Sequence, residues 1–386
     1  MLIVRIILAG VAVVALAVRP GTARGAGVAL GAAALDAALG AAVEPALRIV
    51  APMVVFLAAA LTLAGTLEHA GLGERVAAAL ARRARGSSRA LYVYVCLTCA
   101  ALTATVSLDG AVVLMVPVLL ALRQRHGVAF APLFGGVVVV ANAFSIAVPQ
   151  GNPTNLLIIA RLGLAPTTFL THMFVPGLIA AVLCAVSVAV MERRRLALPY
   201  ASEAQPREPL SREERNAVLA FVTAALAAWV APLLGVAPWW PFSAAVAVGL
   251  IAQRRRPAAF VPWQIGVQIA STLVVIQALG VPNLGPLGSA LGGLLLVAAL
   301  TGLAAALLNN LPVGASAVAL IASAPLGYAA SIGLAVGSLA TPQGSVATLI
   351  ATELAGPDAP EHRVRRLAPL AAMAVLAATL AVRLGL

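Results

Sequence analysis

The sequence lacks lysine altogether, and only 10% of its 386 residues are charged. Aromatic residues make up 4% of the chain, whereas 62% of the residues are hydrophobic. So low a charge content excludes an ordinary soluble domain. Three cysteines are too few for a disulfide framework, which excludes a small disulfide-stapled scaffold. The composition therefore indicates an integral membrane protein.

The cysteines offer one candidate metal motif. Cys96 and Cys99 form a C-x-x-C inside an apolar helical run, a spacing that places both thiols on one helix face. A soft metal or metalloid could bind there, but a zinc site needs further ligands and none is nearby. We interpret both residues as small buried core thiols, and we expect no metal site and no organic cofactor.

The net charge of +12 comes from arginine without lysine. In a soluble protein, a pI of about 11.3 would indicate a nucleic-acid partner. Here the arginines lie in short loops between apolar runs, which is the pattern of the positive-inside rule. We expect a multi-pass protein of the cytoplasmic membrane whose partner is the lipid bilayer and not nucleic acid.

A long apolar stretch over residues 90–122 poses a choice of topology. It follows the arginine-rich, amphipathic segment 74–89, it ends at Arg123 and Arg125, and Ser107–Gly110 breaks it in the middle. A single crossing would leave one basic end outside. A re-entrant hairpin with its tip at the break keeps both ends in the cytoplasm, so we predict the hairpin.

The remaining apolar runs complete two similar halves. Repeat 1, residues 1–192, is predicted to contain the hairpin and a broken helix over 131–160, and a polar cytoplasmic linker over 193–215 follows. Repeat 2, residues 216–386, is predicted to contain a hairpin over 291–322 and a broken helix over 326–354. An odd number of crossings in each half makes the repeats inverted and places both termini outside. The predicted fold is an all-α polytopic membrane protein with about ten spanning helices.

Four polar patches interrupt the apolar sequence in two matching pairs. Ser107–Gly110 precedes Pro149–Asn155, and Asn309–Pro312 precedes Thr341–Ser345. Non-helical backbone in a membrane is tolerated where it is buried in protein or lines a polar cavity, and matching breaks in two halves indicate a transporter's binding site. The alternative is that these residues only kink helices and satisfy freed backbone groups. We predict that substrate is bound by Ser107, Asn152, Thr154, Asn155, Asn309, Asn310, Thr341, Gly344, Ser345 and Thr348.

Asp109 is the carboxylate that the sequence places deepest in the membrane. Intramembrane acids are costly and are functional candidates. We predict that Asp109 couples transport to H⁺ or Na⁺, with Gly110 and Gly151 allowing close backbone approach. The alternative is a solvated turn residue at a hairpin tip that reaches the interface. Four further acidic residues are expected near helix ends at the interface, namely Asp36, Glu44, Glu68 and Glu353.

At these patches the chain resembles the ion transporter superfamily of secondary carriers, which includes arsenite permeases, citrate and dicarboxylate carriers and some sodium/proton antiporters. Residues 149–155 are similar to the family's P-I-G-N-P-x-N signature. Residues 309–312 and 340–349 are similar to the N-N-x-P and T-P-I-G-S-L-A-T-L segments of arsenite permeases. The resemblance implies two re-entrant hairpins, a substrate and coupling-ion site between their tips and the broken helices, commonly a homodimer, and elevator-like alternating access.

The chain departs from the patterns of these families at several positions, so the resemblance does not identify the substrate. Residues 333–339 lack the Asp and Lys that arsenite permeases tend to carry before the second break. The tip Ser107–Gly110 resembles their N-D-G, but it lacks the Ser-Asn-Thr of dicarboxylate carriers. Gln150 and Gln343 stand where the family usually has Ile.

We therefore predict a secondary active transporter, and not an enzyme, that moves a small anion or oxyanion such as arsenite by ion-coupled alternating access. A citrate or dicarboxylate carrier and a sodium/proton antiporter are alternatives within the superfamily. A channel would share the broken helices but would need no coupling residue. An intramembrane enzyme is a further rival, but no histidine lies in the charge-free stretch 257–352 to act as a base.

Overall fold

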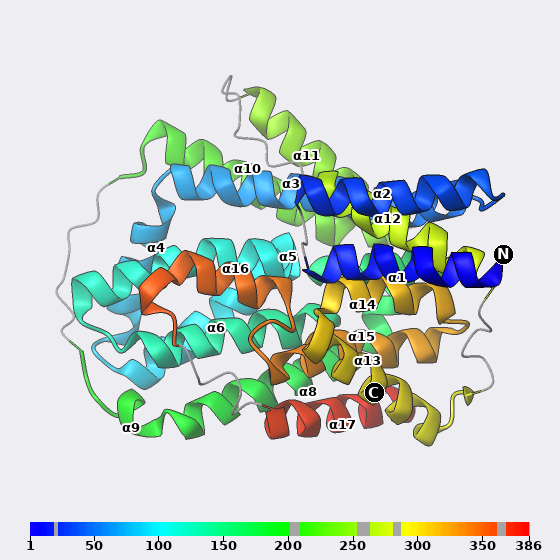
Figure 1. Cartoon of the computed structure of the whole chain (residues 1–386). Coiled ribbons are helices and arrows are strands. Elements are labelled where there is room, and N and C mark those ends of the chain that lie inside the picture. The colour runs from blue at the N-terminus through cyan, green and yellow to red at the C-terminus, as the bar shows by residue number, and fades with distance from the viewer. Residues whose placement is uncertain (19–21, 201–208, 253–262, 281–286, 361–367, 386) are drawn as a thin grey trace.

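The chain forms a bundle of α-helices in a computed structural model (Figure 1). The structure describes residues 1–386 except 19–21, 201–208, 253–262, 281–286, 361–367 and 386. The described residues contain no β-strand, and six of their helices are long and apolar enough to cross a membrane. The prediction of an all-α polytopic membrane protein is confirmed. Some of the loop arginines, Arg254–Arg256, Arg363, Arg365 and Arg366, lie outside the described residues, and so does the middle of the linker.

The first four helices divide into two groups: the first two pack against each other, and the third and fourth pack against the fifth (Figure 1). Arg5 of the first helix forms an ion pair with Asp36 of the second (Nε–Oδ1 3.1 Å), and it also donates to the carbonyl of Ala278. Asp36 lies near the end of the second helix, as predicted, and it is fully buried, with the neighbouring guanidinium compensating its burial. The helices are α1 (Leu2–Val18), α2 (Ala23–Ala38), α3 (Glu44–His69) and α4 (Leu72–Ala84).

Helix α5 (Ser88–His126) folds back on itself. Its backbone leaves the helical region at Ser107, where φ is 74° and ψ is 170°. Tyr200 links the two ends of this segment: its N–H donates at 3.1 Å to the carbonyl of Gly86, two residues before α5, and its ring centroid lies 6.2 Å from that of His126. A straight helix of 39 residues would be about 58 Å long and could not bring its ends together. The predicted first hairpin is therefore present, with its tip at Ser107.

The helix that follows is broken as predicted. Helix α6 (Phe130–Phe144) passes through two short 3₁₀ turns, Ser145–Ala147 and Pro149–Gly151, before α7 (Pro153–Leu162) begins. Pro149 and Pro153 supply no amide hydrogen, which stops the α6 ladder from continuing. The first half ends with α8 (Pro166–Met191), and the short α9 (Arg193–Leu196) lies at the start of the predicted linker.

The second half repeats this order. The hairpin is made of α13 (Leu291–Leu308) and α14 (Asn310–Leu320), which pack together and meet at Asn309, where φ is 91°. Helix α15 (Ala324–Val336) breaks before α16 (Val346–Ala355). The remaining helices are α10 (Arg212–Val230), α11 (Trp239–Ala252), α12 (Trp263–Ala278) and α17 (Ala368–Leu384).

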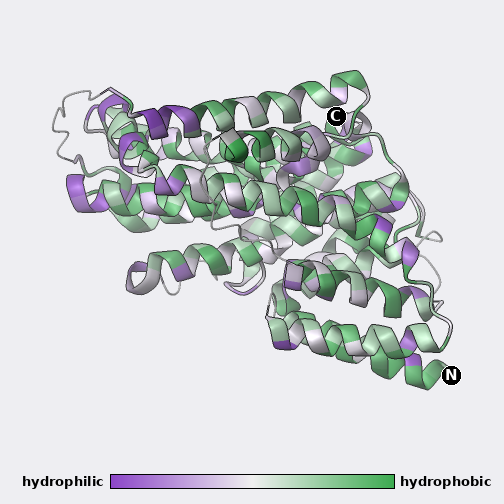
Figure 2. Ribbon diagram, turned by 90° about the horizontal axis from the view of Figure 1, so that it is seen from above, coloured by the Kyte–Doolittle hydropathy of each residue, from purple (hydrophilic) through white to green (hydrophobic). Residues whose placement is uncertain are grey.

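The two hairpins enter the bundle from opposite ends, α5 from the end that carries α4 and α9, and α13–α14 from the end that carries the N-terminus (Figure 1). Hydrophilic residues gather at the α4 and α9 end, where Figure 2 shows the densest purple ribbon. The opposed entry supports the prediction of inverted repeats, whose boundaries stay a prediction.

Candidate functional site

The two hairpin tips share an uncommon backbone conformation. Ser107 and Asn309 have φ values of 74° and 91°, with ψ at 170° and 145°. This region of the map suits glycine, and each other residue held there costs about 1–3 kcal/mol. Both tips are buried, so surrounding contacts hold them in place. Strain at matching positions in two hairpins marks these tips as candidate functional elements.

The first break is organised by two asparagines. Asn152 caps α7, because its Oδ1 accepts from the Thr154 N–H at 3.1 Å and from the Thr154 hydroxyl at 2.9 Å. Asn155 reaches back across the break and donates from Nδ2 to the carbonyls of Ser145 (2.8 Å) and Val148 (3.0 Å). The freed carbonyls of the break are thus satisfied by side chains.

The second break is tied to its own hairpin tip. Asn309 donates from Nδ2 to the Gln343 carbonyl at 2.9 Å, and the Asn310 N–H donates to the Gly344 carbonyl at 2.7 Å. At the start of α16, directly after the break, the Val346 N–H donates to Asn310 Oδ1 at 3.4 Å. Three of the predicted binding residues therefore hold the tip and the break together as one unit.

A matching bond joins each break to the first arm of its hairpin. Gln150 donates from Nε2 to the Ala104 carbonyl at 2.7 Å. In the second half, the hydroxyl of Thr341 donates to the Ala306 carbonyl. Ala104 and Ala306 both lie three residues before the residue at their hairpin tip. The two halves thus use different side chains for the same connection.

The two halves also touch each other at the breaks. Asn142, near the end of α6, lies 3.5 Å from the Thr348 hydroxyl on α16 (Nδ2–Oγ1). Helix α14 packs against α7, where the backbone at Gly314 lies directly against Thr154. One predicted site residue from each repeat, Thr154 or Thr348, thus contacts the other half of the molecule.

Four buried oxygens of the predicted site have no hydrogen-bond partner among the described residues: Ser107 Oγ, Asp109 Oδ1, Asn155 Oδ1 and Ser345 Oγ. A buried polar atom without a partner costs about 1–3 kcal/mol unless something else satisfies it. Oxygen atoms are the ligands that hard cations prefer, and hydroxyl groups can also donate to an anion. These four oxygens are therefore candidate contacts for a bound ion or substrate.

Asp109 is buried in the first hairpin, which packs against α3. The neighbouring Gly110 lies close to the Ala60 carbonyl of α3, since a Cβ added to Gly110 would be 3.9 Å from that oxygen. Asp109 is 6% exposed, which is inconsistent with a solvated turn. Its Oδ1 makes no hydrogen bond to another predicted site residue, so a direct link between Asp109 and the breaks stays a prediction.

Sequence reasoning missed three residues of this cluster. Asn142 and Ser145 lie just before the first break and are fully buried. Ser338, which is also fully buried, is the residue of the second half that corresponds to Ser145. The Ser145 hydroxyl donates to the Asn142 carbonyl at 2.7 Å, as the Ser338 hydroxyl does to Ala335 at 2.8 Å. The signal in the sequence was the equal spacing from each serine to the Pro-Gln-Gly glycine.

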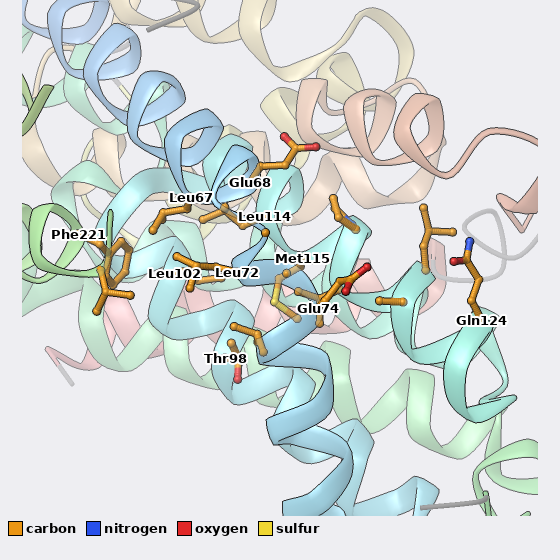
Figure 3. Close-up of a pocket in the computed structure, with 18 residues that line it drawn as sticks. Leu67, Glu68, Leu72, Glu74, Thr98, Leu102, Leu114, Met115, Gln124 and Phe221 are labelled. Atoms are coloured by element: carbon orange, nitrogen blue, oxygen red, sulfur yellow. The ribbon is translucent and has the colours of Figure 1, made fainter. Parts of the chain in front are cut away.

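A separate cavity of about 520 Å³ lies between α3, α4, α5 and α10. Figure 3 shows its mostly apolar side chains, among them Leu67, Leu102, Met115 and Phe221. Both arms of the first hairpin contribute to it, but none of the predicted binding residues lines it. It is therefore distinct from the candidate site.

Comparison with known families agrees with this architecture. The family model described as CitMHS, citrate transporter, matches residues 2–336, which include both hairpins and the first break. No curated protein sequence matches the chain at a significant level. Since the model covers most of the chain, the protein belongs to the CitMHS citrate transporter family and is a secondary transporter.

Proposed function

We propose that this secondary transporter moves a small carboxylate anion of the citrate class by ion-coupled alternating access. The observation that carries the proposal is the buried cluster of hairpin tips and breaks, in which four oxygens have no partner among the described residues. The family's description as citrate transporters favours a carboxylate substrate. Because the proposed transport involves no covalent step, the protein would act as a carrier and not as an enzyme.

The anion would be held mainly by neutral groups. Helices α7, α14 and α16 each begin at a break or a tip, and so does the second arm of α5. Amide hydrogens at a helix N-terminus attract anions, and the helix dipole adds to that attraction. Side chains of the predicted set, such as Asn310, Ser345 and Thr348, would add hydrogen bonds and fix the orientation.

Coupling would depend on Asp109. A buried carboxylate is costly when charged and unpaired, so it gains from binding either a proton or a sodium ion. Neutralising Asp109 would also remove its repulsion of an approaching anion. H⁺ and Na⁺ are both consistent with this role, and the experiment must separate them.

The test is uptake of radiolabelled citrate into proteoliposomes under an imposed pH gradient, an imposed Na⁺ gradient or neither. We expect one gradient to drive accumulation and the Asp109→Asn variant to abolish it while exchange without a gradient persists. Glu44→Gln is the matched control, because Glu44 is exposed and forms its ion pair with Arg48 on its own helix. Full gradient-driven uptake by Asp109→Asn would disprove the coupling role.

Arsenite is a second candidate substrate, and one observation favours it. The segment 340–349 resembles arsenite permeases, and it lies beyond the residues that match the citrate transporter model. The same proteoliposomes test it: saturable arsenite flux without citrate flux would replace the first candidate. Flux of either substrate that neither saturates nor responds to a gradient would indicate a channel.

We further propose that the protein lies in the cytoplasmic membrane as a homodimer, with repeats 1–192 and 216–386 joined by the linker. The clustering of hydrophilic residues at the α4 and α9 end supports the orientation with that end in the cytoplasm. Cross-linking in native membranes would test the dimer, and labelling of single introduced cysteines would test the orientation.

A further inference from the structure

A second cavity, of about 640 Å³, forms a groove on the membrane-facing side of the first hairpin. The first arm of α5 forms one wall and α8 the other, while Val140 and Phe144 of α6 lie between them. Almost every lining residue is apolar, with Arg89 and Arg193 as the charged exceptions. The groove shares no residue with the candidate substrate site.

The shape of the groove comes from the order of side chains along α8. Ala181, Ala185 and Ala189 line it at intervals of four residues and therefore share one helix face. These small side chains leave a trough. Tyr92 on α5 closes part of it from the other side, because its hydroxyl donates to the Ala185 carbonyl at 2.7 Å. The trough is thus a built feature held by a bond between its two walls.

The length of the groove matches one leaflet of a bilayer. Along α8 the lining extends from Leu178 to Val190, which corresponds to about 18 Å of helix. Half of the hydrocarbon core measures about 15 Å. An extended acyl chain from one leaflet would therefore lie along the trough.

Both charged residues lie at the same end of the groove. Arg89 is in the first turn of α5, and Arg193 begins α9 directly after α8 ends. Both side chains are exposed, and neither forms an ion pair within the described part of the chain. The nearby carboxylate of Glu192 is buried and lies 3.5 Å from Arg195. This end therefore presents two cations at the depth of the head groups.

We propose that this groove binds one anionic phospholipid of the cytoplasmic leaflet, with its phosphate between Arg89 and Arg193 and an acyl chain along the alanine trough. Basic pockets between helices on the cytoplasmic side suit anionic lipid head groups, and each arginine near the surface is worth about a fivefold change in affinity. The lipid contacts α6 close to the first break, so its binding would hold the hairpin against the broken helix.

Native mass spectrometry of the purified protein tests the proposal, with phosphatidylglycerol and phosphatidylcholine added separately. We expect one phosphatidylglycerol to be retained per chain, and weaker retention of phosphatidylcholine. The Arg89→Gln/Arg193→Gln variant should lower phosphatidylglycerol retention by about 25-fold. Arg82→Gln/Arg85→Gln, an equal loss of charge outside the groove, should leave it unchanged. Equal retention of both lipids, or an equal effect of the control, would show a nonspecific annular lipid and overturn the proposal.

A second variant tests the trough without changing charge. Ala189→Leu should fill the groove and reduce retention of phosphatidylglycerol. Ala299→Leu is the matched control and should not, because Ala299 is an exposed alanine of the spanning helix α13 and lies outside the groove lining. Thermal unfolding of both variants without lipid shows that they are folded. If Ala189→Leu is folded and retains the lipid as wild type does, the acyl chain does not lie in the trough and the proposal fails.

Discussion

Gly151 lies so close to Ser145 that a Cβ added to the glycine would be 2.3 Å from the Ser145 carbonyl oxygen. The second half repeats this relationship, because a Cβ added to Gly344 would be 2.1 Å from the Ser338 carbonyl oxygen. Real Cβ atoms do not approach backbone so closely, and backbone atoms cannot rotate away as a side chain does. The Pro-Gln-Gly motif thus ends in glycine in both halves because the chain turns back on itself there.

The variants Gly151→Ala and Gly344→Ala should each push the glycine away from the serine carbonyl that it faces across the turn. We expect a loss of about 1–3 kcal/mol in the free energy of unfolding and a large loss of transport, because the proposed substrate site includes both breaks. Thermal unfolding in detergent and uptake in proteoliposomes measure the two effects. Gly65→Ala in α3 is the control, since nothing lies within 4 Å of its added Cβ. Normal uptake by both break variants would show that the tight turns are not required.

The second hairpin tip should be held more firmly than the first. Among the described residues, four hydrogen bonds join the second hairpin to the second break. The residues that make them are Asn309, Asn310, Thr341 and Val346. The first hairpin has one such bond, from Gln150. We expect amide hydrogen exchange to be faster over residues 104–110 than over 306–312, because opening breaks fewer contacts.

The variant Asn309→Gly tests whether the asparagine side chain causes this difference in hydrogen exchange. Glycine adopts the positive φ of the tip without strain, so the variant removes only the bonds made by the asparagine side chain. Exchange over 306–312 should rise toward that of the first tip. Unchanged exchange in this variant, or slower exchange at the first tip in the wild type, would contradict the proposed difference.

Much of this architecture followed from the sequence, because charge and apolar length are local properties. The arginines at both ends of 90–122 were enough to predict a hairpin whose tip the structure places at Ser107. Pro149 and Pro153 likewise marked the first break. The burial of Asp36 was not predictable, since it depends on Arg5 in another helix. The sequence also could not show that Gln150 and Thr341 make equivalent hydrogen bonds. The two bonds have the same place in the two halves, but they come from different residue types.

An ion pair between α4 and α10 should stabilise the end of the bundle that carries α4. Arg75 on α4 bonds to both carboxylate oxygens of Glu214 at the start of α10, with Nη2–Oε2 at 3.0 Å. Glu214 also completes a capping box with Ser211. We expect a coupling energy of about 1 kcal/mol from a double-mutant cycle on Arg75→Gln and Glu214→Gln, measured by thermal unfolding. The exposed pair Arg48–Glu44 should give about half of that or less. A coupling no larger than that of the exposed pair would show that Arg75 and Glu214 do not join α4 to α10.

Two buried serines of the second half allow binding to be separated from stability. Ser345 and Ser338 are both fully buried, but among the described residues only the Ser338 hydroxyl has a partner, the Ala335 carbonyl at 2.8 Å. Ser345→Ala therefore removes no internal hydrogen bond, so the free energy of unfolding should stay the same or rise slightly. If the Ser345 hydroxyl contacts substrate, the same variant should raise KM by about 5- to 20-fold. Ser338→Ala should show the reverse pattern, with lower stability and nearly normal KM. A fall in stability with unchanged KM in Ser345→Ala would place Ser345 outside the binding site and would favour the view that the polar breaks only shape the helices.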